Sequence, residues 1–368
     1  MSRKISVTMF IEFIIIITYI SIGVSRSSNN IKYISLVFAI LIMLFFCIKD
    51  GVKIVLLKPY KRFLILILSI TIFTMFKNIY YDTYYIEFLK EILFIFIPLL
   101  FAILITSFNS IKLERILNII FYIYLISFIF IFATKFNLTN LKSINFLGSY
   151  SPFESKFCID FSLLSIYFFN LKSMKKFYVS FLLMLLTLNR MIIIATIFYL
   201  LMKICKFDKL QYKILKTIAY ITSGAIIFVS IFMYNDRLEQ WIFNNLSISL
   251  DQLTSGRSDF LYWITSNNEF AAKGFGYSTN FLSSNGVMEA FNVVHGDFLK
   301  VYLELGIIFL FIFIGIFINI SSKNKEIMCI VIYLIICMGF NHILDYIDHL
   351  TIIFLLIGWL YKYKNTSY

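Results

Sequence analysis

The sequence of 368 residues predicts an all-α, polytopic transmembrane protein with about twelve spans. Three observations support this fold class. The chain is 60% hydrophobic and only 14% charged, whereas a soluble domain carries about 25% charged residues. Apolar runs of about 20 residues, the length that crosses a hydrocarbon core, recur from end to end. Basic residues gather in short segments between these runs, as they do in cytoplasmic loops.

The expected spans follow from these runs and loops. They cover about residues 5–24, 33–48, 63–77, 91–108, 116–134, 157–171, 177–189, 190–204, 217–234, 298–320, 326–344 and 347–361. The first run contains Glu12 and is followed by no small-residue cleavage site, so we expect it to be retained. The basic loops, facing anionic lipid, place both termini in the cytoplasm. The net charge of +13 therefore indicates membrane orientation rather than nucleic-acid binding.

The stretch 177–204 is short for two crossings, yet both of its flanks are basic. A single span would leave Arg190 within lipid, at a cost of roughly 2.5–3.5 kcal/mol or more. We therefore expect two short helices that meet at Asn189 and Arg190.

These spans divide the chain into three parts. Residues 1–234 form an N-terminal transmembrane region of about nine spans, and residues 298–368 form a C-terminal region of about three spans with a cytoplasmic tail. Residues 235–297 form a large outer loop between the ninth and tenth spans. A connection of this length is uncommon unless it is functional. The five cysteines are scattered without metal or disulfide spacing, so we expect them to be packing residues.

Arginines supply the first candidate chemistry. Arg190 has apolar sequence on both sides; it either orients two short helices or pairs with an anion at membrane depth. Arg257 lies between a Ser-Gly turn and an aromatic run that includes Trp263, and Asp259 is close enough in sequence to neutralise it. In KGFGY, Gly274 and Gly276 form either a plain turn or a loop that cradles phosphate.

The segment His295-Gly296-Asp297 precedes an apolar helical run. Asp297 suits the N-cap position, and His295 then lies just outside a helix N-terminus, which favours its neutral form. The alternative is a solvated loop histidine. Near the C-terminus, His342, Asp345 and His349 share one face if a single helix continues through them. We expect water to solvate them at an outer turn, and we predict no metal site.

Three stretches together resemble the bacterial O-antigen polymerase and ligase family of integral membrane glycosyltransferases. TLNRMIIIA resembles the family's T-x-S-R stretch, with Asn189 in place of serine. SGRSDFLYWITSNNEFAAKGFGY resembles its R…W…G-x-G segment, and HGDFLKVYLELGIIFLFIF resembles its H-N-x-x-L…E-x-G-x-x-G block. Gly296 stands where the family has asparagine, and Phe309 stands where it has the final glycine, so no role for that amide is carried over.

The resemblance implies a chemistry without metal or cofactor. Members use glycans carried on undecaprenyl pyrophosphate at the periplasmic face of the bacterial inner membrane. Arg190 and Arg257 would stabilise the pyrophosphate leaving group, and His295 would activate the acceptor hydroxyl. Asp297, Gly274, Gly276 and Trp263 would bind substrate.

The implied function is a polymerase for O-antigen or capsule-type polysaccharide, within lipopolysaccharide or polysaccharide biosynthesis. Its expected partners are the undecaprenyl-pyrophosphate-linked oligosaccharide, membrane lipid and a chain-length regulator protein. The alternatives are a ligase, which moves the finished glycan to lipid A–core, and a flippase for the lipid-linked repeat. A flippase would show broken helices and charges deep within its spans.

Overall fold

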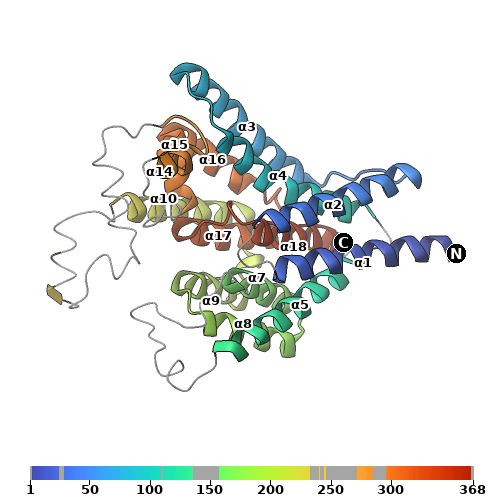
Figure 1. Ribbon diagram of the computed structural model, residues 1–368. Coiled ribbons are helices and arrows are strands. Elements are labelled where there is room, and N and C mark those ends of the chain that lie inside the picture. The colour runs from blue at the N-terminus through green and yellow to red at the C-terminus, as the bar shows by residue number, and fades with distance from the viewer. Residues whose placement is uncertain are drawn as a thin grey trace.

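The computed structural model describes residues 2–24, 29–108, 111–135, 157–232, 240, 244–245, 272–284 and 296–365. Within these ranges every regular element is a helix, which confirms the predicted all-α class (Figure 1). The helices are α1 Ser2–Val24, α2 Asn29–Lys49, α3 Lys58–Tyr81, α4 Ile86–Ser107, α5 Leu113–Lys135, α7 Phe157–Asn170, α8 Met174–Thr187, α9 Arg190–Ile204, η1 Phe207–Lys209, α10 Tyr212–Phe232, α14 Tyr277–Ser284, α15 Asp297–Leu305, α16 Ile307–Asn319, α17 Lys325–Phe340 and α18 Ile347–Asn365.

Five of the described helices, α2, α3, α4, α5 and α10, are long and apolar enough to cross a membrane. Shorter apolar segments occur in α1, α7 and α16. Large apolar side chains such as Phe38, Phe76 and Ile308 are mostly exposed, as on a surface that faces lipid. The protein is therefore an all-helical membrane protein, and the number of about twelve spans stays a prediction.

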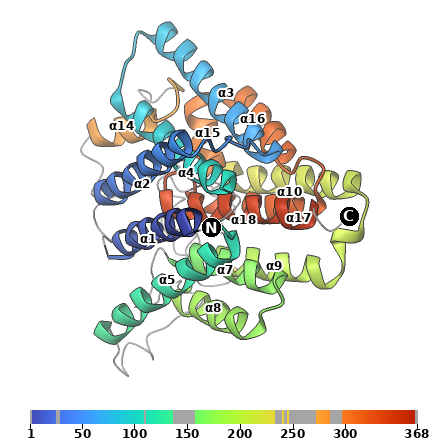
Figure 2. The ribbon, with the colours of Figure 1, turned by 90° about the vertical axis from the view of Figure 1, so that its right-hand side faces the viewer.

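The helices α17 and α18 form the centre of the bundle (Figure 2). Helix α17 packs against α9 and α10, and α18 packs against α4 and α7. Most of their side chains are buried, including Tyr333, Phe354 and Trp359. Cys47, Cys158, Cys329 and Cys337 are buried as packing residues, whereas Cys205 is exposed. Helices α14 and α15 lie at one end of the bundle, and both termini point towards the other (Figure 1).

The expected break within 177–204 is confirmed. Helix α8 ends at Thr187, Leu188 adopts a left-handed conformation, and α9 begins at Arg190. The side chain of Asn189 caps α9 by accepting a hydrogen bond from the Ile192 N–H at 3.3 Å. Two short helices therefore occupy this stretch. That each of them crosses the membrane stays a prediction.

The single continuous helix expected over 298–320 is wrong. Helix α15 ends at Leu305, and Gly306 adopts a φ of 89° before α16 begins at Ile307. This conformation is strained for residues with a Cβ, so glycine breaks the helix here. With 9 residues, α15 is about 14 Å long and too short to span a bilayer. It is not among the described helices that are long and apolar enough to cross a membrane.

The expected turn between the last two apolar helices is present at His342 and Asp345, so these residues and His349 do not share one helical face. Helix α17 ends at Phe340 and α18 begins at Ile347, so His342 and Asp345 lie in the connection. The expected solvation is wrong for His349, which is 1% exposed and hydrogen-bonded to Asp160, whereas His342 and Asp345 are partly exposed.

The fold depends on close helix contacts, of which one is testable at Gly358. A methyl group added there would overlap the hydroxyl of Tyr60, which is fully buried and donates to the Phe354 carbonyl at 2.8 Å. We expect Gly358→Ala to lower the free energy of unfolding by about 1–3 kcal/mol, because overpacking displaces Tyr60. Thermal unfolding of the purified protein in detergent measures the change.

Gly315 provides the matched control for this substitution. It lies in α16, and a Cβ built there meets nothing within 4 Å. Gly315→Ala should leave the melting temperature equal or higher, because alanine favours the helix. Equal melting temperatures for Gly358→Ala and the wild type would contradict the predicted overlap.

Candidate functional site

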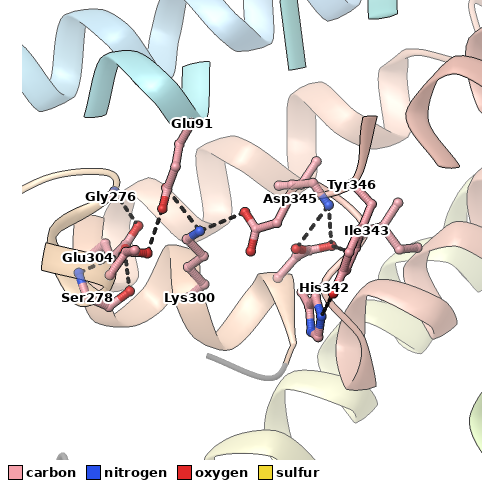
Figure 3. A network of polar contacts seen from close by, with 12 residues as sticks. Glu91, Gly276, Ser278, Lys300, Glu304, His342, Ile343, Asp345 and Tyr346 are labelled. Carbon is pink, nitrogen blue, oxygen red and sulfur yellow. Dashed lines mark hydrogen bonds and ion pairs between the residues drawn. The ribbon is translucent and has the colours of Figure 1, made fainter. Parts of the chain in front are cut away.

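A buried polar network lies at the end of the bundle where α14 and α15 pack (Figure 3). We call it the α15 network and define it as Glu91, Asp297, Lys300, Glu304 and Asp345. Three of these residues come from α15, Glu91 comes from α4, and Asp345 comes from the α17–α18 connection. The network therefore joins segments that are far apart in the sequence.

Helical geometry places the α15 members together. Asp297, Lys300 and Glu304 are separated by three and four residues, which puts them on one face of a helix. That face points into the protein, because all three residues are fully buried. Charged side chains buried in this way must find partners, since an unpaired buried charge is very costly.

Lys300 is the cation of the network. Its ammonium group lies 2.8 Å from Asp345 Oδ1 and 3.0 Å from Glu91 Oε2 (Figure 3). It also lies 5.2 Å from the centroid of the Phe275 ring, a favourable cation–π position. Glu91 in turn accepts a hydrogen bond from the Thr279 hydroxyl at 2.7 Å. Lys300 thus ties α4, α15 and the α17–α18 connection together.

Glu304 is held by the turn that contains Gly-x-Gly. Its carboxylate accepts hydrogen bonds from the N–H groups of Gly276 at 2.9 Å and Ser278 at 3.0 Å, and from the Ser278 hydroxyl. The Gly274 N–H donates to the Glu304 carbonyl at 3.0 Å. Gly276 has a φ of 86°, and a Cβ there would lie 2.9 Å from the backbone nitrogen of Phe88. Glycine is therefore required for this turn to pack against α4.

The KGFGY turn directs backbone N–H groups at an acidic group, but in this structure that group is the protein's own Glu304 side chain. Backbone N–H groups converge on Glu304 in the manner expected for a bound phosphate. A substrate-binding role for Gly274 and Gly276 stays a prediction. The structure adds that the Gly276 N–H is already bonded to Glu304.

The prediction that Asp297 is an N-cap is wrong. Gly296 holds that position, and Asp297 is the first residue of α15. The carboxylate instead accepts hydrogen bonds from the N–H groups of Ile343 at 2.9 Å and Leu344 at 3.3 Å. The Asp297 N–H donates to the Asn341 carbonyl at 3.3 Å. Asp297 therefore fixes the start of α15 to the α17–α18 connection. This contact could not be predicted from the sequence, because the two segments are far apart in the chain.

Gly296 is explained by the same contact. Its φ is 101°, and a Cβ there would lie 2.8 Å from the Gly339 carbonyl oxygen of α17. Any larger side chain would both strain the backbone and collide with α17. This packing accounts for glycine where the resembling family carries asparagine.

Asn189, which precedes Arg190, contacts the connection between α17 and α18. Asn189 Nδ2 donates to Asn341 Oδ1 at 3.1 Å, so the α8–α9 turn contacts the residue that also binds Asp297. Arg190 is the first residue of α9 and is partly buried. The structure therefore links Arg190's turn to α15. The other expected site residues, Arg257, Trp263 and His295, lie outside the described residues.

Burial shifts the pKa values of the α15 residues. Burial raises the pKa of Glu304 to about 8, although Lys300 and the Ser278 and Gly276 donors lower it. Burial and the nearby Asp345 raise the pKa of Asp297 well above its usual value. Burial lowers the pKa of Lys300, but Asp345, Glu91 and Glu304 raise it by more. One lysine thus shares its charge among several carboxyl groups, and Glu304 holds a proton near neutral pH.

Sequence reasoning missed Glu91, Lys300, Glu304 and Asp345 as members of a site. Their signal was present, because Asp297, Lys300 and Glu304 are charged residues at helical spacing within a run assigned to the membrane. Across the described part of the chain, no group of three or more His, Cys, Asp or Glu residues is placed to hold a metal ion.

Comparison of the chain with protein-family models, curated proteins and solved structures finds no match.

The raised pKa of Glu304 predicts a pH dependence of stability. The folded protein holds a proton that unfolded glutamate releases above about pH 4.5, so this proton stabilises the fold at low pH. The stabilisation is lost as the pH rises through about 8. We expect the melting temperature in detergent to fall between about pH 6 and about pH 9, and Glu304→Gln to weaken this fall because glutamine does not titrate.

Asp82→Asn is the control, because Asp82 is an exposed carboxylate at the C-terminal end of α3. It should retain the wild-type pH dependence. If Glu304→Gln melts with the same pH dependence as the wild type, Glu304 does not hold the proton.

Proposed function

We propose that this protein is a membrane glycosyltransferase that polymerises undecaprenyl-pyrophosphate-linked repeat units into O-antigen or capsule-type polysaccharide at the periplasmic face of the inner membrane. Its reaction would transfer the growing glycan from its lipid pyrophosphate to a hydroxyl of the next lipid-linked unit. It would act without a metal ion, with both termini in the cytoplasm and in concert with a chain-length regulator.

The observation that carries the proposal is the meeting of three stretches that resemble one family. Asn189 of the first contacts Asn341, which also binds Asp297 of the third. Gly276 and Ser278, in and beside the end of the second, bind Glu304 of the third. These stretches are separated in sequence, and chance resemblance gives no reason for them to converge at one end of a bundle.

The roles proposed for individual residues follow from their chemistry. The departure of a lipid pyrophosphate develops negative charge on phosphate oxygens, which guanidinium groups bind bidentately. Arg190 and Arg257 are assigned to that charge, and His295 is assigned as the base for the acceptor hydroxyl. Trp263 is assigned to sugar stacking. His295 precedes Gly296 and Asp297, whose contacts with α17 and the α17–α18 connection fix the chain directly after it.

The two arginines assigned to the donor pyrophosphate are cationic, whereas the α15 network is rich in carboxyl groups. The described network has an excess of carboxyl groups over Lys300, which disfavours a pyrophosphate within it. We therefore assign the network to support of the acceptor side, where it positions the backbone, and keep the arginines for the donor. A ligase that moves the finished glycan to lipid A–core would use the same donor chemistry and is the alternative.

Transport of the lipid-linked repeat is the second candidate, and two observations favour it. Helices are broken at Leu188–Asn189, at Gly306 and at 341–346, and ionisable groups are buried within the bundle. Broken helices and buried charges are typical of transporters. The convergence of the three resembling stretches favours the transferase.

Complementation of a polymerase-null host tests the proposal. The wild type should restore a ladder of glycan chain lengths on a gel. Arg257→Ala, His295→Ala and Arg190→Ala should each leave single-repeat product, with losses of about a hundredfold or more, because each removes charge stabilisation or proton transfer. Arg190→Lys should recover only part of the activity, since lysine lacks the planar fork.

Arg62→Ala is the matched control, because Arg62 is exposed near the start of α3. It should give a normal ladder at equal expression. Normal ladders from all three site variants would refute the assigned roles. A ligase would be identified if, in a ligase-null host, polymer accumulates on the carrier lipid only when this gene is absent. A flippase would be identified if loss of the gene removes the repeat from the outer leaflet.

The membrane orientation is tested by reporter fusions. A periplasmic reporter fused after Ser283, in α14, should be active, and the same reporter fused after Lys209, in the basic segment before α10, should be inactive. The reverse pattern would place the α15 network in the cytoplasm and exclude a periplasmic transferase.

A further inference from the structure

A second buried cluster lies beside the α15 network, in the core of the bundle. We call it the Asp160 cluster and define it as Tyr19 of α1, Lys32 of α2, Tyr124 of α5, Asp160 of α7, and Asp348 and His349 of α18. Asp348 and His349 follow Asp345 closely in the chain, so one short segment supplies members of both clusters. The Asp160 cluster takes no part in the proposed reaction.

Two polar contacts define the cluster, a hydrogen bond between His349 and Asp160 and an ion pair between Lys32 and Asp348. His349 Nδ1 lies 2.7 Å from Asp160 Oδ1, with side chains that are 1% and 0% exposed. Lys32 Nζ lies 2.7 Å from Asp348 Oδ2, with side chains that are 4% and 5% exposed. Both aspartates lie in the first turn of a helix, where the helix dipole favours their ionised form.

The charges of the cluster balance only when His349 carries a proton. Two aspartates and Lys32 leave a net charge of about −1 when His349 is neutral, in a region shielded from water. Other polar groups near the cluster, Tyr33 and Tyr346, add no positive charge, and Asp345 is paired with Lys300. An isolated buried negative charge is costly, so the site favours one additional positive charge.

Three buried oxygen atoms of the cluster are candidate ligands for that charge. Among the described residues, Asp160 Oδ2 and the Tyr124 hydroxyl have no hydrogen-bond partner, and the Tyr19 hydroxyl has only the Thr351 side chain beside it. Asp160, Tyr19 and Tyr124 are all 0% exposed. The two tyrosine rings lie in edge contact, with centroids 6.1 Å apart. Tyr124 also contacts Phe157, which is one helical turn before Asp160. Buried oxygens without partners are expected to bind an ion, a proton or water.

We infer that the Asp160 cluster binds one monovalent cation, either a proton on the Asp160–His349 pair or an alkali-metal ion between the Asp160 carboxylate and the two tyrosine hydroxyls. A divalent or transition metal fits less well, because a single carboxylate and two neutral hydroxyls supply too little charge and too few strong ligands. The inference does not depend on the proposed glycosyltransferase function.

Thermal unfolding of the purified protein in detergent tests the inference. A ligand that binds only the folded state raises the melting temperature with its concentration. In one arm, sodium or lithium replaces choline at constant ionic strength and constant pH, over about a hundredfold range. In the other arm, pH is varied in choline. We expect a rise of about 3 °C or more along one of the two arms.

Variants distinguish a bound proton from a bound alkali-metal ion. If an alkali ion binds, Asp160→Asn should abolish the response to sodium or lithium, and Tyr19→Phe with Tyr124→Phe should weaken it. If a proton binds, the melting temperature should rise with proton concentration without alkali dependence. Asp160→Asn and His349→Gln should then lose that rise, while the tyrosine variant retains it. The comparison is made in a Glu304→Gln background, which removes the titration of Glu304.

Glu326→Gln is the matched control, since the buried Lys203–Glu326 ion pair lies at the start of α17, away from the Asp160 cluster. It should keep the wild-type response even where its melting temperature is lower. If Asp160→Asn does not fold, the tyrosine double variant tests for a bound alkali ion and His349→Gln tests for a bound proton. The inference is overturned if wild type and cluster variants respond equally to alkali ions and to pH.

Discussion

Lys300 is a cation without access to water, and the arrangement around it follows from that constraint. A buried ammonium group is tolerated only when carboxylates are close and well oriented, and removal of one partner from such a pair costs about 3–5 kcal/mol. Glu91 and Asp345 satisfy Lys300 from two different parts of the chain. The pairing therefore fixes α4, α15 and the connection between α17 and α18 at one end of the bundle, where the candidate site is built.

Around this ion pair, backbone groups perform most of the positioning. Glu304 collects N–H groups from the Gly-x-Gly turn, and Asp297 collects N–H groups from Ile343 and Leu344. In both cases a carboxylate of α15 satisfies the backbone of an irregular segment. Buried irregular backbone is tolerated only where its polar groups are bonded. The acidic residues of α15 thus satisfy the backbone N–H groups of the irregular segments that pack against it.

The same segment links the two buried clusters. Asp345 faces Lys300, whereas Asp348 pairs with Lys32 and His349 pairs with Asp160. Tyr346 lies between them, with its ring centroid 5.0 Å from that of His349 and its hydroxyl 3.0 Å from His342 Nε2. One segment of the chain therefore contacts the Asp160 cluster, Asp297 and the α8–α9 turn.

The sequence by itself determined the all-α class, the membrane location and the break before Arg190. These depend on hydrophobic length and on single charges within apolar runs, which are local properties. Only the tertiary structure decided that Glu304 fills the Gly-x-Gly turn, that Asp297 binds the α17–α18 connection, and that Gly306 divides the expected tenth span. The pairing of Asp160 with His349 was equally hidden, because it joins residues 189 positions apart. Hydropathy reports how each residue partitions between water and lipid, whereas partners among buried charges are chosen by the packing of helices that are distant in sequence.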